Sequence, residues 1–564
     1  MTVTDAAGNE LTSITLNPRA SQTWRADQLG IAEPRSGVVA TAQWGTLDPE
    51  KLETAQICEL VDEVEAERGS PKDTGDALSS HAANYADMVK VVQNGFAYAE
   101  GTDYQWNAIE DTLYVDWGPQ GAEPAAGAEY TVYVYECVEP RIAGVEKHTV
   151  GTVGVRTSSA TEAVDGYSAV PQDDVALAGD GGAVLEGQSR WVLPIVQTNN
   201  GWNTEIFITN VSGKTNSVSA TFYAAGGQGY AGEGEMLLSG KTLAAGETVR
   251  IDLLDYGFEE GVVGSLWIDA THAVVAGAFR HKVETGMMLT TNAQPRHDTE
   301  GSEVKFGPLV FRDYNGWNTG INIANLSSET NQVTVTYYNY AGNVVATDSV
   351  TIPARAMEYV YTPATGNFGI GANQITAVRI EGTQPLVAAI DEVKYLGGQG
   401  EGHAMSYPAS SALWGWETWE LDDSGRYWYD NLLALPLVQK GNPTTGVGDT
   451  SGINLFNPDG EYSVNAYIQF VDSAGVPVAP TVGADDSEAP IVLPLSAGAG
   501  ATVYTLNYSE MPAGFQGAAI VGVVGDDGEL VGVSNNVNYA VDGDGSAVYN
   551  LANTVLWDYY YPSE

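Results

Sequence analysis

Apolar and polar residues alternate at every second position along much of the chain, in short runs separated by glycine, asparagine and serine. The clearest run is residues 333–338, in which valine and tyrosine alternate with threonine. Side chains of a β-strand point alternately to its two faces, so this period predicts strands with one buried face. The turn residues between the runs predict antiparallel connections. The chain is therefore expected to be mainly β.

One arrangement of strands occurs three times. In the first copy, residues 201–204 (Gly-Trp-Asn-Thr) precede a strand that ends at Asn210, and in the second copy residues 316–319 (Gly-Trp-Asn-Thr) precede a strand that ends at Asn325. A less similar third copy ends the corresponding strand at Asn457. About seven strands fit in each copy, which is typical of an immunoglobulin-like β-sandwich. A repeat of this length predicts tandem sandwiches, each with its own core.

A chain of 564 residues is too long for a single core. The repeats, and the changes in composition between them, predict a series of domains. They are an incomplete β-sandwich half-repeat (1–45), an α+β segment (46–160), a Gly/Asp-rich linker (161–184), three β-sandwich repeats (185–300, 301–410 and 431–541), an aromatic hairpin (411–430) between the second and third repeats, and an aromatic C-terminal tail (542–564).

The α+β segment is expected to contain two helices and a small sheet. Asp48-Pro49-Glu50 is typical of a helix start, because aspartate caps the helix and proline suits its first position. Apolar residues from Leu52 to Val64 continue this helix, and a second is expected over residues 76–92. Strands are expected at residues 96–106, 112–117 and 130–137.

Two cysteines are present, Cys58 on the first expected helix and Cys137 on the last expected strand of this segment. Two thiols far apart in sequence can form a bridge in an oxidising compartment or be buried as small apolar residues. We predict the disulfide, which would staple the segment.

The chain is strongly acidic, with 72 Asp and Glu residues against 24 Lys and Arg residues and a net charge of −48. Such a surface repels nucleic acid and anionic membranes. The apolar runs are shorter than the ~20 residues of a membrane span, so no membrane insertion is expected. Residues 1–15 have neither the basic start nor the apolar core of a signal peptide.

Tryptophans are the main candidates for ligand binding. Trp202 and Trp317 occupy the same position in two repeats, where an exposed ring would stack on a sugar and a buried ring would form core or inter-domain contacts. The third repeat has Asp449 at this position, which argues against a universal core role. The aromatic hairpin adds four candidates for the same two roles: Trp414, Trp416, Trp419 and Trp428.

Asn210 and Asn325 lie in Asn-x-Ser sequons and are candidate glycosylation sites. Asn457 has the same position in the third repeat but is followed by proline, which excludes glycosylation. An asparagine side chain can also bond to the backbone two residues ahead and so form a turn. Turn formation explains all three residues and is the interpretation we favour.

Motifs for catalysis and for bound metals are weak. The sequence Asp542-Gly543-Asp544 starts like a calcium loop, but Asn553 stands where a bidentate glutamate is needed. Calcium could still bind at the acidic pairs Asp173-Asp174, Asp485-Asp486 and Asp526-Asp527. The six histidines lack zinc-site spacing, and no nucleophile elbow or phosphate loop is present. We therefore expect no enzyme activity, no bound metal in a defined site and no cofactor other than calcium.

The two Gly-Trp-Asn-Thr repeats and the third copy resemble the Ig-like repeats of secreted surface proteins from filamentous green non-sulfur bacteria and their relatives. This resemblance implies an extracellular scaffold and transfers no catalytic residue. Residues 96–137, with Tyr114-Val115-Asp116-Trp117 and a Gly-x-x-Tyr-x-Val strand, resemble a small β module of bacteriophage tail and baseplate proteins.

These observations favour a structural protein at the cell surface or outside the cell, the self-assembling subunit of a filament, layer or sheath. The alternatives are a virion tail or fibre protein and a carbohydrate-binding adhesin that contacts polysaccharide. Donation of a C-terminal strand to the next subunit would make a head-to-tail homopolymer. The donor would contain Val555, Leu556, Trp557, Tyr559 and Tyr560, and the acceptor would be the open edge of the half-repeat at Ile14, Leu16, Val38 and Val39. The competing explanation is that the missing half-repeat lies outside this sequence.

Overall fold

The structure is a computed structural model, in which almost every described residue lies in a strand or in a turn between strands. It describes residues 2–5, 10–14, 36–43, 57–69, 76–79, 88–93, 96–98, 103–109, 112–117, 123–138, 147–155, 189–226, 234–282, 285–296, 303–363, 370–395, 402–414, 420–421, 427–428, 433–442, 449–474, 477–478, 491–508, 511–524, 529–539 and 545–553. The chain divides into two compact units, with Gln43–Lys147 and Leu421–Arg426 in the second unit and the remainder in the first.

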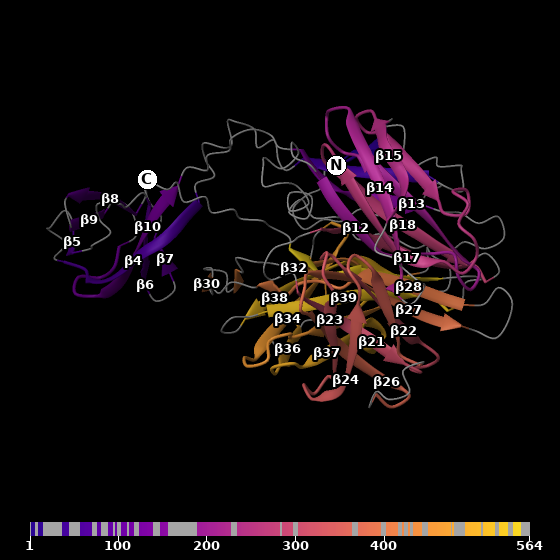
Figure 1. Ribbon diagram of the computed structural model, residues 1–564. Coiled ribbons are helices and arrows are strands. Elements are labelled where there is room, and N and C mark those ends of the chain that lie inside the picture. Colours follow the sequence, from indigo (N-terminus) through magenta and orange to yellow (C-terminus); the bar gives the residue numbers. More distant parts are fainter. Residues whose placement is uncertain are drawn as a thin grey trace. The chain divides into compact units, whose positions relative to one another are not determined.

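The first sandwich consists of two four-stranded antiparallel sheets. Sheet I has the strand order β15-β14-β17-β12, extended by the short strand β20, and sheet II has the order β16-β13-β18-β19. The strands, in magenta to pink in Figure 1, are β12 (Ser189–Gln197), β13 (Trp202–Asn210), β14 (Asn216–Ala224), β15 (Glu235–Leu243), β16 (Thr248–Asp252), β17 (Val263–Ala270), β18 (Val274–Lys282), β19 (Met287–Asn292) and β20 (Gln294–Pro295).

The second sandwich repeats this topology strand for strand. Its sheet I has the order β24-β23-β26-β21 and its sheet II the order β25-β22-β27-β28. The strands are β21 (Val304–Arg312), β22 (Asn318–Asn325), β23 (Asn331–Tyr338), β24 (Val344–Ile352), β25 (Met357–Tyr361), β26 (Gln374–Gly382), β27 (Leu386–Tyr395) and β28 (Gly402–Pro408).

The third sandwich has the same pairs, and its two sheets are joined where β32 also pairs with β33. Its strands, orange to yellow in Figure 1, are β32 (Leu433–Asn442), β33 (Asp449–Phe456), β34 (Val464–Asp472), β35 (Pro477–Val478), β36 (Ile491–Leu495), β37 (Gly500–Tyr504), β38 (Phe515–Val524), β39 (Glu529–Val537), β40 (Ser546–Asn550) and β41 (Ala552–Asn553). A 3-10 turn, η4 (Thr505–Asn507), follows β37.

The prediction of a mainly β fold of tandem sandwiches is confirmed. In β23, Val333, Val335 and Tyr337 are buried in the core while the residues between them are exposed or half-buried, as the alternation requires. Each sandwich has eight main strands instead of about seven. The first two strands lie in different sheets, whereas in an immunoglobulin constant domain they share one.

The expected boundary of the third sandwich at residue 541 is wrong. Strand β40 pairs with β39 and β41 pairs with β32, so residues 546–553 supply the last strands of this sandwich. They correspond to β19 and β20 of the first sandwich. The sequence did not reveal this because the last strand of each repeat is short and shares no motif with the others.

The N-terminal strands form a separate sheet with the order β11-β3-β1-β2. Strands β1 and β2 pair with the same register shift as β23 and β24, which places Thr4 at the position of Tyr338 and Val39 at the position of Ala377. The sheet therefore has the order of a sheet I. Its strands are β1 (Thr2–Asp5), β2 (Glu10–Ser13), β3 (Ser36–Gln43) and β11 (Lys147–Val155).

The acceptor edge expected at Val38 and Val39 of the half-repeat is already paired. Strand β3, which contains Val38 and Val39, pairs with β1 on one side and with β11 on the other. Strand β11 follows the second unit in sequence and occupies the place of the first strand of a complete repeat. The sequence suggested an open edge because this strand comes after the inserted segment instead of before it.

The second unit is β throughout its described residues. Its sheets have the orders β4-β10-β6-β7 and β5-β9-β8, and its core includes Val91, Leu113 and Val132. The strands are β4 (Ile57–Glu67), β5 (Asp76–Ser79), β6 (Met88–Gln93), β7 (Phe96–Ala97), β8 (Tyr104–Ile109), β9 (Thr112–Trp117) and β10 (Glu129–Val138).

The expectation of two helices in this segment is wrong wherever the expected helices fall on described residues, because residues 57–67, 76–79 and 88–93 form strands. The stretch Glu63-Val64-Glu65-Ala66-Glu67 alternates at period two and pairs with β10, and in β6 Val89 and Val91 are buried while Lys90 is exposed. In these residues, pairing with neighbouring strands decides the secondary structure, although some apolar residues are also spaced as in a helix. No helix among the described residues is long and apolar enough to cross a membrane.

Candidate functional site at the junctions between sandwiches

A buried asparagine fixes the same turn in every sandwich. In the second sandwich, Asn325 is fully buried, and its Nδ2 donates hydrogen bonds to the carbonyl oxygens of Glu329, Ile352 and Pro353 at 2.7, 3.3 and 2.9 Å. Its Oδ1 accepts a bond of 3.0 Å from the backbone N–H of Ser327. The side chain therefore connects two loops at one end of the sandwich, the one between β22 and β23 and the one between β24 and β25.

Asn210 and Asn457 form the same four bonds to the corresponding backbone atoms. The prediction that turn chemistry explains all three asparagines is confirmed. In the folded protein, the amide nitrogens of Asn210 and Asn325 are buried and hydrogen-bonded, so neither is accessible for glycosylation.

Trp202 lies at the junction between the first and second sandwiches. Its side chain is 5 % exposed and belongs to a cluster with Met287 and Leu289 of its own sandwich and Val393 and Ala404 of the second. The inter-domain contact, one of the two alternatives for this residue, is therefore the one that the structure shows. The ring offers no open face to a sugar.

Trp317 has the corresponding place at the junction between the second and third sandwiches. It is 3 % exposed, and its Nε1 donates a 2.9 Å hydrogen bond to the hydroxyl of Tyr539. The ring of His403 lies 6.2 Å away, and the ammonium of Lys394 lies 4.7 Å from the Tyr539 ring. Trp317 is thus also an inter-sandwich residue.

The hairpin tryptophans are only partly described. Trp414 lies in β29 (Leu413–Trp414), which pairs with β39 of the third sandwich. Trp428 lies in β31 (Tyr427–Trp428), and β30 (Glu420–Leu421) precedes it. Trp416 and Trp419 lie outside the described residues.

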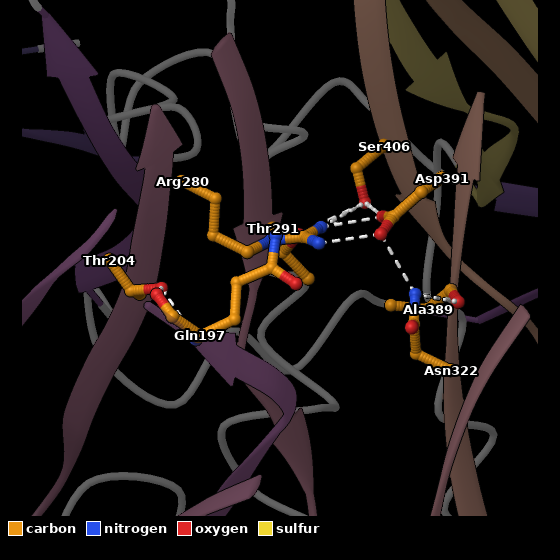
Figure 2. Close-up of polar contacts among 8 residues, drawn as sticks. All are labelled: Gln197, Thr204, Arg280, Thr291, Asn322, Ala389, Asp391 and Ser406. Carbon is orange, nitrogen blue, oxygen red and sulfur yellow. Dashed lines mark hydrogen bonds and ion pairs between the residues drawn. The ribbon is translucent and has the colours of Figure 1, made fainter. Parts of the chain in front are cut away.

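A buried ion pair between sandwiches joins Arg280 of β18 to Asp391 of β27. Arg280 is fully buried, and its Nη1 and Nη2 lie 2.5 Å from Oδ2 and Oδ1 of Asp391 in a bidentate pair. Figure 2 shows the guanidinium reaching across to the second sandwich, where Nη2 also contacts the hydroxyl of Ser406 at 3.1 Å. A bidentate pair between arginine and a carboxylate is among the strong charge-assisted hydrogen bonds of proteins.

The second sandwich presents Asp391 in a prepared site. Asn322 Nδ2 donates to Oδ2 at 2.8 Å, and Ser406 Oγ donates to Oδ1 at 2.7 Å. Thr291 of the first sandwich bonds to both Arg280 and Ser406 at 3.0 Å. Both carboxylate oxygens are therefore satisfied, which offsets the desolvation of the charges. Sequence reasoning missed this pair, although each residue is a charge that directly follows a run of apolar and small residues, 274–279 and 386–390.

The apolar parts of the first junction bring sheet I of one sandwich against sheet II of the next. Val192 of β12, Tyr223 of β14 and Trp267 of β17 pack with Ala324 of β22 and Val387 of β27. The first three residues belong to sheet I of the first sandwich, and the last two belong to sheet II of the second.

The second junction uses the same positions. Phe306, Tyr338 and Ala377 of sheet I in the second sandwich pack with Phe456 and Val531 of sheet II in the third. By register, Phe306 corresponds to Val192, Tyr338 to Tyr223, Phe456 to Ala324 and Val531 to Val387. The sandwiches therefore stack in one direction through two unlike faces, which is a heterologous contact.

Residues 49–217 match a family model described as a domain of unknown function (DUF4815). The matched range contains most of the second unit, strand β11 and the first strands of the first sandwich. No curated protein matches the chain. The match assigns no activity to the residues that it covers.

The second unit has its own buried polar cluster around Asp76. Oδ2 accepts hydrogen bonds from Tyr130 Oη at 2.7 Å and Trp117 Nε1 at 3.0 Å, and Oδ1 accepts bonds from Gly69 N and Arg68. Burial by itself raises the pKa of Asp76, but these donors together hold it below its usual value. With every oxygen bonded, the carboxylate serves to hold the two sheets together.

Glu392 is a buried acid in the second sandwich. Oε2 accepts a 2.6 Å hydrogen bond from the Thr319 hydroxyl, and Oε1 has no hydrogen-bond partner among the described residues. Burial, together with the neighbouring charge of Asp391, raises the pKa of Glu392 well above its ordinary value of 4.5.

Replacing Glu392 by glutamine should remove a pH-dependent loss of stability. The folded protein holds the Glu392 proton more tightly than the unfolded chain does. The contribution of Glu392 to stability is therefore fully present below pH 4.5 and is lost as the pH rises toward the raised pKa. Within this window each pH unit costs about 1.4 kcal/mol. Urea unfolding from pH 4 to 8 should show that the free energy of unfolding of Glu392→Gln increases relative to that of the parent protein as the pH rises. The exposed acid Glu381 gives the control Glu381→Gln, and equal slopes for both variants would contradict the assignment.

The two cysteines lie directly opposite each other on β4 and β10, where Cys137 pairs with Cys58. Cys58 is thus on a strand instead of a helix. The Cα atoms of opposed residues in an antiparallel pair are ~4.5–5.5 Å apart, which is within the range of disulfides. This register is compatible with the predicted bridge.

When the protein is purified in its native state and then denatured without reductant, we expect a thiol-alkylating reagent to modify neither Cys58 nor Cys137. After reduction, intact mass should show both residues alkylated. The bridge should stabilise the second unit by roughly 4 kcal/mol on the chain-entropy account. Alkylation of both residues in unreduced protein would exclude the disulfide.

The remaining candidates for metal binding and assembly fall mostly outside the described part of the chain. Asp173, Asp174, Asp485, Asp486, Asp526, Asp527 and residues 542–544 lie there, as do Leu16, Val555, Leu556, Trp557, Tyr559 and Tyr560. Ile14 follows β2 and is half-buried. No group of His, Cys, Asp and Glu able to hold a metal ion is found among the described residues.

Donation of the C-terminal strand is not supported in the form predicted from sequence. The first part of the tail, β40 and β41, completes the third sandwich of its own chain. The expected acceptor position beside β3 holds β11.

Proposed function

We propose that this chain is a structural protein, the self-assembling subunit of an extracellular or cell-surface filament, layer or sheath. The observation that carries the proposal is the repetition of one heterologous junction. Sheet I of the first and of the second sandwich packs on sheet II of the next through apolar and aromatic contacts, and at the first junction the buried pair of Arg280 and Asp391 adds a charged contact from β18. Such contacts hold successive sandwiches in one geometry and can extend beyond one chain.

Among the described residues, no further sandwich packs on sheet I of the third sandwich, so this sheet ends the stack within them. Pro436 is exposed there, whereas the corresponding Pro194 and Pro308 are buried in the two junctions. Ile520 and Ala434 lie opposite each other on this sheet and are half-buried. We propose that this face binds a further copy of the chain. The carbohydrate-binding alternative has less support, because Trp202 and Trp317 are used within the junctions.

Sedimentation velocity over a range of concentrations, with negative-stain microscopy, tests this function. The full chain should form head-to-tail oligomers, and Ile520→Lys should raise the concentration needed for association roughly tenfold or more. Leu506→Lys is the control, since Leu506 is 51 % exposed and lies on η4, outside sheet I. A full chain that stays monomeric at every concentration, or an Ile520→Lys variant that associates like the parent, would refute head-to-tail assembly.

A further inference from the structure

Sheet II of the first sandwich has an apolar outer face that is covered. Phe207 and Phe279 form an edge-to-face pair at 5.5 Å, and Met288 completes their cluster. Phe207 lies between Ile206 and Ile208, which point into the core, so it points away from the core. The cluster residues are only 6, 3 and 2 % exposed.

The corresponding positions in the other sandwiches contact the preceding sandwich. By register, Phe207 and Phe279 correspond to Asn322 and Asp391 in the second sandwich. Asp391 forms the ion pair with Arg280 of the first sandwich, and Asn322 donates a hydrogen bond to Asp391. Phe207 also corresponds to Asn454 in the third sandwich, whose Oδ1 lies 3.3 Å from the hydroxyl of Tyr340 in the second. This face is therefore the junction face of the second and third sandwiches.

The N-terminal sheet precedes the first sandwich in the sequence and has the form of the sheet that packs on this face in the other sandwiches. The N-terminal sheet has the strand order of a sheet I, and Thr4 and Val39 stand at the positions of the junction residues Tyr338 and Ala377. It belongs to the same compact unit as the sandwiches.

We infer that the N-terminal sheet covers sheet II of the first sandwich, and that sheet I of the third sandwich from another copy competes for the same face. The N-terminal sheet is then a cap on the stack. Covering the face within one chain opposes head-to-tail association, and releasing the cap promotes it. The competition between copies, though not the cap itself, rests on the proposed self-assembly.

Two adjacent methionines provide an internal test in the full chain. Met288 lies on the capped face, whereas Met287 is 1 % exposed and packs with Trp202 at the other junction. Methionine oxidation by hydrogen peroxide depends on access to the sulfur.

The variant Val39→Pro should disrupt β3, because proline removes a ladder hydrogen bond in a strand that is paired on both sides.

In Val39→Pro, peptide mass spectrometry should show Met288 oxidised roughly tenfold or more faster than in the parent, with Met287 unchanged. Phe207→Asp weakens the same contact from the sandwich side and should give the same selective increase. If Met288 is as protected in both variants as in the parent, or if Met287 is exposed equally, the cap is refuted. If Met288 is selectively released but sedimentation shows no increase in association, the cap stands and competition between copies is wrong.

Discussion

Replacing Arg280 by methionine is expected to lower the free energy of unfolding by about 3–5 kcal/mol, because it leaves Asp391 buried without a counter-charge. The junction between the first two sandwiches should loosen as a result. Urea unfolding should show the loss, and hydrogen exchange should localise it to β18, β19 and β28.

A surface pair of similar composition provides the matched control. Arg379 and Glu381 lie 3.2 Å apart but are 38 % and 51 % exposed, so Arg379→Met should cost about 1 kcal/mol or less. The double variant Arg280→Met/Asp391→Leu removes both charges and should recover much of the stability. A loss at Arg280 no larger than that at Arg379 would show that the buried pair does not hold the junction.

Replacing Asn325 by aspartate is expected to destabilise the second sandwich by roughly 3 kcal/mol or more, although the shape of the side chain is unchanged. The substitution places a carboxylate oxygen against the carbonyl oxygens of Glu329, Ile352 and Pro353, which now accept bonds from Nδ2. The bond from the Ser327 N–H to Oδ1 can remain. The loss should appear in urea unfolding and should decrease at low pH, where the carboxyl group is protonated.

Asn343 lies in an exposed turn of the same sandwich and provides the control Asn343→Asp, for which little change is expected. If both substitutions cost the same, the buried network around Asn325 does not contribute to stability as proposed. The equivalent changes at Asn210 and Asn457 should reproduce the effect in the other two sandwiches, since the bonds are the same.

The structural features that depend on a local sequence pattern could be predicted from the sequence. Alternation in residues 333–338 gave the buried face of β23, and the position of Asn325 two residues before a serine gave its turn. The helices expected near Cys58 failed because spacing of apolar residues fits both a helix and a strand, and the pairing partner β10 is distant in sequence. Strand pairing across such distances is a tertiary property.

The contacts between sandwiches could not be predicted from the sequence either. Arg280 and Asp391 are 111 positions apart and lie in different repeats, and nothing local marks them as partners. Trp202 and Trp317 were recognised as equivalent, but whether they meet a sugar or a neighbouring sandwich depends on how the sandwiches stack. The same limit explains why residues 546–553 were not assigned to the third sandwich.

A short strand in the first and third repeats, and a single bridge in the second, returns the end of the repeat to the place where that repeat began. Pro295 pairs with Trp191, Ser410 with Phe306 and Asn553 with Leu433. Entry and exit of every sandwich therefore lie side by side, and every sandwich offers the same two unlike faces. A whole sandwich can then be gained or lost by recombination with its neighbours still matched, so the length of the array can evolve in steps of one repeat.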